Sequence, residues 1–467
     1  MKFVNRHKEL SRLEGLLRSR TSGLAVIWGR RRVGKTRLLL KWTEKNKGVY
    51  FVADESSPSI QRKFLSLSVE QALPGFSEAE YPDWQSLFLR LARDASQAKW
   101  RGPLVIDELP YLISGSPELS SILQKFIDHD AKKTNLVTVL CGSSQRMMQS
   151  AILDESAPLY GRADELMKLQ PITIGYMKQA LKLKTPRDVV QSYTIWGGIP
   201  RYWELASKVA QDLYTTIDRL VLDPMGPLNE EPQRLLYAES PPAIHLRPIL
   251  DAIGLGANRL SEIASRMQEP ITSLARPIER LIELDLIQKE LPYGTDPENS
   301  KKTLYKIKDP FLRFWFKVVA SRRSLFSQVS PLARSRWLKE DLPYLFATTW
   351  KDLCRSAVPI LSEKWETIYE PSGRFWQGQG PEWDVLSQSP DGKHFLIGEA
   401  KWTEKKPTVH WIQNTIQELK NKGIPPVKRH PHAQIHYVLF IPEKPKQLKL
   451  PTDVRVVEAK DIIAALC

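Results

Sequence analysis

The sequence predicts a multidomain α/β protein whose first domain is built on a parallel β-sheet. At 467 residues the chain is too long for one hydrophobic core, so about two to four domains are expected. Short, nearly continuous apolar runs alternate with helical stretches in its first part, which is typical of parallel strands covered by helices on both faces. These runs lie at residues 24–28, 48–53, 104–108 and 136–144.

A phosphate-binding loop follows the first of these runs. Residues 29–36 fit the pattern G-x-x-x-x-G-K-[ST] and lead directly into a helical stretch. In such a loop the backbone N–H groups and the helix N-terminus face a polyphosphate. Lys35 is expected to reach the β- and γ-phosphates, and Thr36 to ligate Mg²⁺. The expected nucleotide-binding residues are Gly29, Arg30, Arg31, Arg32, Val33, Gly34, Lys35, Thr36 and Arg37.

Polar residues end two further strands at the same edge of the predicted sheet, where the ligands of parallel sheets bind. Asp107 is expected to hold Mg²⁺, and Glu108 to orient or deprotonate the attacking water, because phosphoryl transfer depends on positioning and charge neutralisation. Ser143 or Ser144 could hydrogen-bond the γ-phosphate or this water. Polar residues also end strands for ordinary turn reasons, so both interpretations of the serines stay open.

Composition limits the class of protein without identifying a partner. The net charge of +15 suits a polyanionic partner, although it also serves solubility. Cys141, Cys354 and Cys467 lie far apart, which argues against a zinc site or a disulfide framework and fits a reducing cytoplasm. No signal peptide or apolar run of about 20 residues is present, so we expect a cytoplasmic protein without membrane contact.

These motifs resemble the archaeal-type ATPases of the STAND and AAA-like P-loop NTPases, up to about residue 310. The likeness runs through residues 3–10, the phosphate loop, and residues 105–108, 141–144, 158–162 and 197–200. The resemblance implies an ATPase that uses ATP and Mg²⁺. It also implies that Arg162 senses the terminal phosphate and that Pro200 closes a helical lid over the nucleotide. The alternative for Arg162 is a salt bridge at a helix end.

Two helices followed by a β-hairpin are expected in the middle of the chain, which is the order of a winged helix. Helical patterns cover residues 260–267 and 270–284, and strands are expected at 286–290 and 303–307 around a polar loop at 292–300. The apolar residues on one face of the second helix are Ile271, Leu274, Ile278 and Leu281.

Basic residues favour contact between this region and a DNA duplex. Arg266, Arg276 and Arg280 are expected on the exposed face, and residues 301–340 hold 11 Lys and Arg against two Asp and Glu. A stripe of this kind attracts phosphate. Pro277, however, is expected to kink the helix that would read the groove, and winged helices in similar families often serve packing and regulation. Both possibilities stay open.

The C-terminal part of the chain contains a strong hairpin signal. If Asp391 and Gly392 form a two-residue turn, counting outward places Asp384 opposite Glu399. Directly opposed like charges destabilise a hairpin, and a shared divalent cation would explain them. Lys401 points to the same face as Glu399, where it could position a water and stabilise charge on a phosphate.

This segment resembles the PD-(D/E)xK nuclease-like domain over roughly residues 346–450. The likeness rests on residues 373–376, 382–384 and 398–402. It implies that Asp384 and Glu399 hold a metal and that Lys401 is catalytic. Such nucleases usually carry a Glu on the preceding helix, where this chain has Lys351. Asp352 is the candidate substitute for this Glu, and a weakened metal site or a binding-only core is the alternative.

The complete fold prediction is a P-loop NTPase parallel sheet, a helical lid, a winged helix and a restriction-endonuclease-like α/β domain. The leading hypothesis is a Mg²⁺-dependent ATPase whose nucleotide state controls a C-terminal domain that cleaves or binds DNA. The alternative is a nucleotide-gated regulator of the STAND type that binds DNA or protein, as a monomer or homo-oligomer, and cleaves nothing. The expected domains are an ATPase domain at 1–180, a lid at 181–238, a winged helix at 239–318, a basic helical linker at 319–345 and a nuclease-like domain at 346–467.

Overall fold

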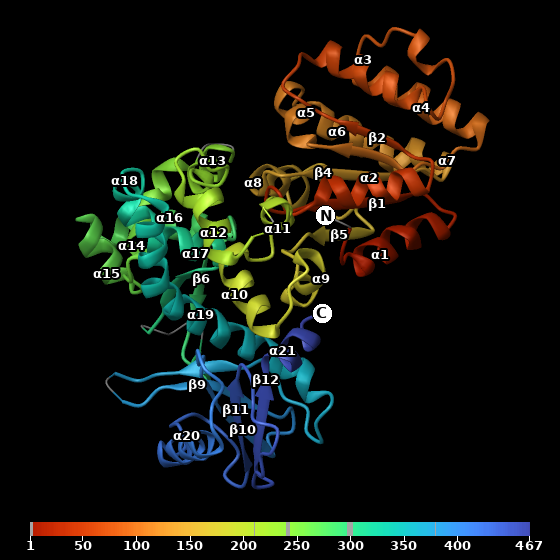
Figure 1. Ribbon diagram of the computed structural model, residues 1–467. Coiled ribbons are helices and arrows are strands. Elements are labelled where there is room, and N and C mark those ends of the chain that lie inside the picture. Colours follow the sequence, from red (N-terminus) through yellow and green to blue (C-terminus); the bar gives the residue numbers. More distant parts are fainter. Residues whose placement is uncertain (1–2, 210, 240–242, 297–301, 379) are drawn as a thin grey trace.

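The computed structural model describes residues 3–209, 211–239, 243–296, 302–378 and 380–467. Figure 1 shows an N-terminal sheet with its helices at the upper right, a helical middle part, and a second sheet at the bottom that holds the C-terminal part of the chain. Hydrophobic clusters fill the two faces of the first sheet, while one continuous core joins the middle part to the second sheet. The middle part and the second sheet therefore share an interior.

The first sheet is parallel throughout, in the order β2–β3–β4–β1–β5. The predicted strands are all present, and β5 at the edge is an addition. It reads Glu-Leu-Met-Lys, which is too short and too polar to stand out as a buried strand. The strands are β1 (Gly23–Trp28), β2 (Val49–Val52), β3 (Leu104–Asp107), β4 (Val137–Gly142) and β5 (Glu165–Lys168).

Helices α1 and α2 cover one face of this sheet, and α3 to α6 cover the other (Figure 1). Ala25 and Ile27 of β1 pack in the cluster of α1 and α2, whereas Leu24 and Val26 pack in the opposite cluster. This alternation is that of a strand buried on both sides. The helices are α1 (His7–Arg18), α2 (Lys35–Lys45), α3 (Pro58–Val69), α4 (Trp84–Ala98), α5 (Leu109–Gly115), α6 (Leu119–Lys125), α7 (Ala131–Thr134) and α8 (Gln145–Met148).

Helices alone form the first half of the middle part. Its longest early helix, α10, begins with a capping box between Thr185 and Asp188, which satisfies two N-terminal backbone N–H groups. Helix α11 begins at Pro200, a residue suited to the first helical position. The helices are α9 (Met177–Leu181), α10 (Pro186–Trp196), α11 (Pro200–Val209), α12 (Leu213–Ile217), α13 (Glu231–Tyr237) and α14 (Arg247–Gly254).

The predicted order of two helices and a hairpin is present. Helices α15 (Leu260–Met267) and α16 (Ala275–Glu283) precede the antiparallel strands β6 (Ile287–Glu290) and β7 (Leu304–Ile307). The predicted loop at 292–300 lies partly outside the described residues. The expected kink at Pro277 is wrong, because this proline lies in the first turn of α16, where its missing N–H has no helical acceptor.

One long helix, α19 (Pro331–Ser362), crosses the expected boundary between a basic linker and the C-terminal domain. Ser330 caps its first turn by accepting a hydrogen bond from the Ala333 N–H at 3.4 Å. Its buried side of Trp350, Cys354 and Val358 belongs to the continuous core. The segment 319–345 is therefore part of the support of the second sheet. Helices α17 (Pro310–Phe314) and α18 (Arg323–Phe326) precede α19.

The second sheet is mixed, in the order β12–β11–β10–β9–β8. β8, β9 and β10 are antiparallel, whereas β10, β11 and β12 are parallel. β9 and β10 pair Val385 with Gly398, and continuing this register by one residue places Asp384 opposite Glu399, as predicted. The elements are β8 (Gly373–Phe375), β9 (Trp383–Gln388), β10 (His394–Ala400), α20 (Val409–Asn421), β11 (Gln434–Ile441), β12 (Val454–Glu458) and α21 (Ala459–Ala465).

Direct contacts join the second sheet to the parts before it. The Tyr293 N–H, beyond β6, donates to the Arg374 carbonyl of β8 at 2.8 Å. Arg187 of α10 donates to the Thr403 carbonyl at 2.5 Å, just after β10. The hairpin of the winged helix is thus packed against the C-terminal sheet.

Within the described part of the chain, no helix is both long enough and apolar enough to cross a bilayer.

Candidate functional site

The phosphate loop joins β1 to α2 in a conformation that requires glycine. Gly29 has a φ of 149°, and a Cβ atom there would lie 2.7 Å from the Leu169 carbonyl oxygen. Gly34 has a φ of 98° directly before the first residue of α2. Because both positions disfavour side chains, the backbone N–H groups can curl toward the helix N-terminus. The predicted strand, loop and helix are confirmed.

Lys35 lies inside this loop. Its Nζ donates to the carbonyl oxygens of Gly29 at 2.7 Å and of Arg30 at 3.3 Å, and the residue is only 4% exposed. Burial lowers the pKa of Lys35, while Glu108 and Asp107 are among the nearby groups that act in the opposite direction. The side chain is thereby held where a phosphate would meet its ammonium group.

Asp107 and Thr36 lie side by side at the strand ends. Thr36 Oγ1 donates to Asp107 Oδ2 at 3.0 Å, and the Glu108 N–H donates to Asp107 Oδ1 at 2.9 Å. Tyr50 of β2 also donates its hydroxyl to Asp107 Oδ2. The sequence analysis missed Tyr50. Its signal was the adjacency of β2 and β3, which pair Val52 with Asp107.

Glu108 has a left-handed backbone conformation with φ 55° and ψ 40°, which is unusual for a residue with a side chain and is often found at functional sites. Its carboxylate accepts from the Ser143 N–H at 3.1 Å and from the Ser143 hydroxyl. Ser144 Oγ is buried and has no partner among the described residues. Ser143 is therefore the serine that positions Glu108.

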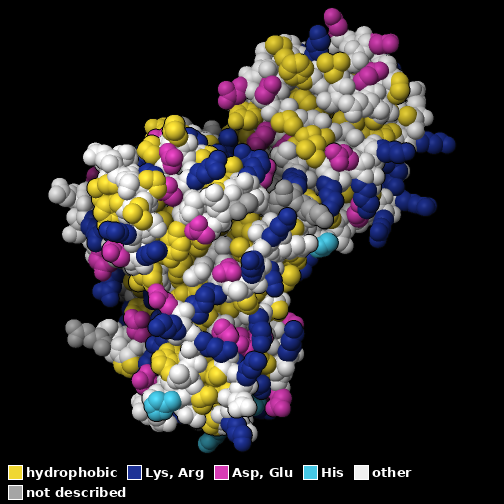
Figure 2. Space-filling view, in the orientation of Figure 1, with side chains coloured by type: hydrophobic (Ala, Val, Ile, Leu, Met, Phe, Trp, Pro, Cys, Tyr) yellow, Lys and Arg dark blue, Asp and Glu magenta, His cyan; other side chains and the backbone are white. Residues whose placement is uncertain are grey.

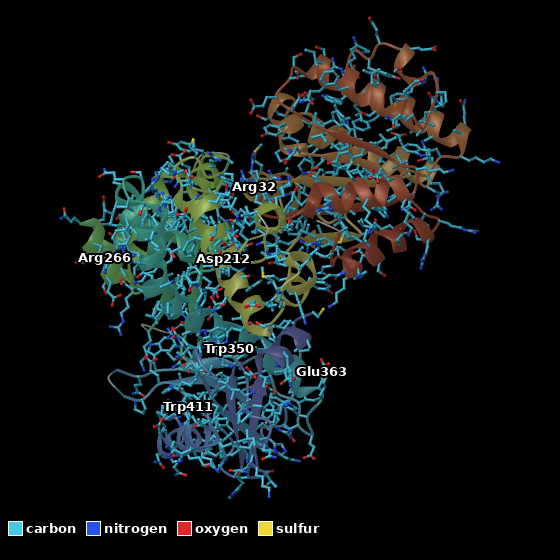
Figure 3. All side chains as sticks on the ribbon, viewed as in Figure 1. Arg32, Asp212, Arg266, Trp350, Glu363 and Trp411 are labelled. Atoms are coloured by element: carbon cyan, nitrogen blue, oxygen red, sulfur yellow. The ribbon has the colours of Figure 1, made fainter. Side chains whose placement is uncertain are left out.

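A cavity of about 650 Å³ opens over the loop. It lies where the first sheet meets the middle part, where Figure 3 places Arg32 and where Figure 2 shows Lys and Arg side chains together. Arg201, Glu204 and Arg234 from α11 and α13 line it and were missed, because nothing local marks lid residues as facing the loop. The predicted residues among its lining are Arg31, Arg32, Gly34, Lys35, Thr36, Arg37, Glu108, Ser143 and Pro200.

Two arginines of the loop bind distant parts of the chain. Arg30 and Asp309 form an ion pair at 2.8 Å, with their side chains 8% and 5% exposed. Arg32 pairs with Glu231 of α13, whose other carboxylate oxygen accepts from the Tyr202 hydroxyl at 2.8 Å. The guanidinium of Arg30 is turned to Asp309, so only its backbone can face a nucleotide, and its nucleotide contact stays a prediction.

Val33 and Arg162 differ from the expectation as well. The Val33 side chain is fully buried with Leu38 and Leu169, so only its backbone can face a nucleotide. Arg162 Nε donates to Asp128 at 2.9 Å, and this arginine is not among the described residues that line the cavity. Arg162 thus forms a salt bridge, which was the alternative interpretation of this residue.

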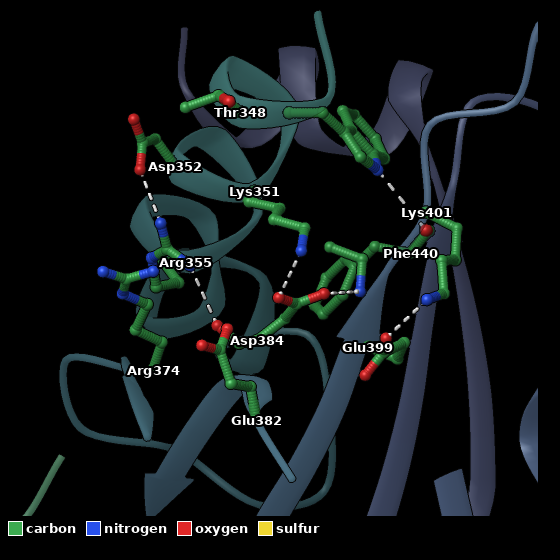
Figure 4. A network of polar contacts seen from close by, with 12 residues as sticks. Thr348, Lys351, Asp352, Arg355, Arg374, Glu382, Asp384, Glu399, Lys401 and Phe440 are labelled. Carbon is green, nitrogen blue, oxygen red and sulfur yellow. Dashed lines mark hydrogen bonds and ion pairs between the residues drawn. The ribbon is translucent and has the colours of Figure 1, made fainter. Parts of the chain in front are cut away.

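Lysines hold the two carboxylates at the far end of the chain (Figure 4). Lys351 Nζ lies 2.7 Å from Asp384 Oδ1, and the Ala400 N–H donates to Asp384 Oδ2 at 3.2 Å. Glu399 pairs with Lys401 and with Lys422, each at 2.7 Å. Lys422 was missed because it approaches from the end of α20, 23 residues along the chain.

Basic side chains pair with all three acids of this second site, Asp352, Asp384 and Glu399. Asp352, the expected substitute ligand, pairs with Arg313 at 2.8 Å and Arg355 at 2.5 Å. Although burial opposes it, Arg313 and Arg355 lower the pKa of Asp352 to about 2. In the described ranges no group of three or more His, Cys, Asp or Glu residues is arranged to hold a metal. Asp384 and Glu399 are paired with lysines in this structure, and the metal-binding role expected for them stays a prediction.

Many basic residues of the segment 301–340 form ion pairs. Arg280 is also less exposed than expected, at 15%, and lies near Glu283 at 3.5 Å. These pairs reduce the free positive charge of the expected stripe, while Arg336 and Lys339 lie exposed. Its ion pairs are Lys306–Glu290, Lys308–Asp285, Arg313–Asp352, Arg322–Asp341, Arg323–Glu230 and Arg334–Asp218.

Comparison with known proteins agrees with the first site. Residues 3–205 match a family described as an ATPase domain predominantly from Archaea, and residues 315–412 match a family of archaeal and bacterial proteins of unknown function. The N-terminal part of this chain is thus similar to the ATPase domains of that family. The described fold, with its parallel five-stranded sheet, agrees with this similarity.

Individual proteins are similar to this chain over different shares of its length. An uncharacterized protein of Methanocaldococcus jannaschii is 28% identical over 410 residues, which cover 86% of this chain and 88% of that protein. A short protein of the same organism, described as ATP-binding, is 47% identical over 45 residues, or 10% of this chain and 76% of that one. A Walker-type ATPase of Pyrococcus abyssi shares the fold with a TM-score of 0.53 and 21% identity, over 68% of this chain and 96% of that chain.

Proposed function

We propose that the protein is a Mg²⁺-dependent ATPase whose nucleotide state controls how its C-terminal domain binds DNA. The observation that carries this proposal is the pair of ion pairs from the phosphate loop, Arg30–Asp309 and Arg32–Glu231. They join the loop to the segment after the winged-helix hairpin and to the lid. A change in the loop on nucleotide binding therefore acts directly on the segment after the hairpin and on the lid.

The first site fits ATP with Mg²⁺. Gly29, Gly34 and the start of α2 provide the phosphate cradle, and Lys35 adds a positive charge inside it. Thr36 and Asp107 supply a hydroxyl and a carboxylate oxygen, which are the hard ligands that Mg²⁺ takes. When bound, Mg²⁺ neutralises charge on the phosphate oxygens. Glu108, held by Ser143, orients a water and accepts its proton.

A chain of contacts leads from this loop to the second site. Asp309, the partner of Arg30, also caps α17 by accepting from the Leu312 N–H at 2.9 Å. Arg313 of α17 pairs with Asp352 of α19. The neighbouring residue of α19, Lys351, holds Asp384. Contiguous ion pairs of this kind support energetic coupling between sites, which variants must demonstrate.

DNA is the partner that the charge favours. The chain carries a net charge of +15, and three lysines gather at the second site. A second candidate function is DNA cleavage, which is favoured by Asp384, Glu399 and Lys401 meeting at the end of a mixed sheet. Incubation of plasmid DNA with Mg²⁺ or Mn²⁺ and ATP tests it, since nicking would support cleavage and intact plasmid would exclude it.

Phosphate release from ATP tests the ATPase. Wild type is expected to turn over ATP, and Lys35→Ala and Glu108→Gln are expected to lose turnover. Glu108→Gln should still bind ATP, because the phosphate cradle is intact. Arg93→Ala is a matched control, since Arg93 is 63% exposed on α4 and pairs only with its neighbour Asp94 among the described residues. Turnover that survives Lys35→Ala would contradict the proposal.

A further inference from the structure

The Asp384–Glu399 site holds more positive than negative charge. Three ammonium groups, of Lys351, Lys401 and Lys422, lie 2.7 Å from oxygens of the two carboxylates. These five side chains together carry a net charge of one positive unit, and Glu418 also acts on Lys401. A divalent cation would have to displace lysines from both carboxylates, against their Coulomb attraction. Charge at this site favours an anion.

Lysines form the solvent-facing layer of the site. The side chains of Asp384 and Glu399 are 8% and 6% exposed, whereas those of Lys351 and Lys401 are 38% and 42% exposed. Lys422 is 28% exposed. The carboxylates thus lie beneath and orient the ammonium groups above them (Figure 4).

The three lysines come from separate elements that the fold holds together. Lys351 projects from α19, Lys401 follows β10, and Lys422 follows α20. Lys422 Nζ also donates to the Glu382 carbonyl at 3.0 Å. An ammonium group has three N–H donors. Within the described residues, Lys351 and Lys401 each contact one carboxylate, so donors remain for a further acceptor.

A tetrahedral oxyanion bound here would meet charged donors from three directions. A phosphodiester of nucleic acid has this chemistry, and charge-assisted hydrogen bonds to phosphate are short and strong.

We infer that the Asp384–Glu399 site binds a phosphodiester of the DNA backbone through Lys351, Lys401 and Lys422, without a metal ion and without cleaving it. This inference rests on the proposed DNA-directed function and names the contact that carries it out. Asp384 and Glu399 act as positioning residues that hold the lysines. The residues where a metal-dependent site was expected instead present ammonium groups to the backbone.

The test measures how DNA binding by the full chain depends on salt. A short fluorescein-labelled duplex is titrated with protein in EDTA and then in Mg²⁺, at several KCl concentrations, and anisotropy gives the affinity. Each lost phosphate contact lowers the slope of log affinity against log salt by about one. Because the three lysines share one phosphodiester, Lys351→Gln/Lys422→Gln is expected to lower the slope by about one. Lys406→Gln is the matched control, since Lys406 is 43% exposed and pairs with Glu443 in the same sheet domain.

A second measurement decides the question if the double variant is unfolded by circular dichroism. Mn²⁺ is titrated into wild type and Glu399→Gln without DNA, and bound metal is counted by electron paramagnetic resonance. The inference predicts equal Mn²⁺ stoichiometry, because the wild-type site takes no metal. One fewer Mn²⁺ in Glu399→Gln would overturn it.

Other results separate this inference from the proposed function. If wild type binds no DNA at low salt in any nucleotide state, DNA is not the partner and the proposed function fails with the inference. If wild type binds DNA but only with Mg²⁺, cuts it, or keeps its salt slope in the double variant, only the inference fails. Binding in EDTA with a lowered slope in the double variant and an unchanged slope in Lys406→Gln supports it.

Discussion

Removing the carboxylate of Asp309 should destabilise the protein far more than removing an ordinary helix cap. In Asp309→Ala the Arg30 guanidinium stays buried without its counter-ion, and two of its nitrogens already have no partner in the described structure. Breaking a buried pair in this way costs about 3–5 kcal/mol. Loss of the cap on Leu312 adds about 1 kcal/mol.

Two comparisons separate these contributions. Asp309→Asn keeps a capping side chain but removes the charge. Its loss of unfolding free energy should therefore approach that of Asp309→Ala to within about 1 kcal/mol. Asp83→Ala removes only an exposed cap, on the Ser86 N–H at 2.7 Å, and should cost about 1 kcal/mol. Urea unfolding, followed by tryptophan fluorescence, gives the shifts in midpoint. Equal shifts for Asp309→Ala and Asp83→Ala would refute the reasoning.

Three further outcomes are expected. Asp352 has a folded pKa of about 2, below its unfolded value, so its stabilisation is present above about pH 4 and is lost as pH falls toward 2. The difference in unfolding free energy between wild type and Asp352→Asn, measured by urea unfolding, should therefore shrink by roughly 1 kcal/mol between pH 5 and pH 3; a constant difference would contradict this. Tyr50→Phe should raise the Mg²⁺ concentration for half-maximal ATP turnover about tenfold, because a hydroxyl that holds Asp107 is lost, whereas Tyr81→Phe should not change it. Arg201→Ala should raise the KM for ATP with Arg162→Ala near wild type, since only Arg201 lines the cavity; the opposite order in a steady-state assay would restore Arg162 as the phosphate sensor.

Local patterns were sufficient for the parts of the fold that local geometry determines. The phosphate loop was predictable because a strand, two glycines and a helix start are contiguous in sequence. The opposition of Asp384 and Glu399 was predictable because a tight turn fixes strand register. The helices and hairpin around residues 260–307 followed from apolar periodicity and turn residues.

Ion pairs between residues far apart in the sequence account for the features that local patterns did not predict. A cluster of Lys and Arg in sequence reads as a basic surface, yet Arg313, Arg322 and Arg334 point inward to acids far along the chain. Arg30 likewise meets Asp309, 279 residues away. No local signal gives the partner of a charge, because the tertiary fold alone brings the two together. The continuity of α19 was not predicted, because a change in charge along the sequence was interpreted as a domain boundary.

The central claim is that nucleotide state controls DNA binding. Its most direct test is the affinity of the full chain for a labelled duplex with a non-hydrolysable ATP analogue and with ADP, at one low salt concentration in Mg²⁺. Coupling of about 1–3 kcal/mol between sites corresponds to a difference of roughly 5- to 150-fold in affinity. We predict a difference in this range for wild type and a much smaller one for Asp309→Asn, which lacks the ion pair to the loop. Equal affinities in the two nucleotide states of wild type would contradict the account.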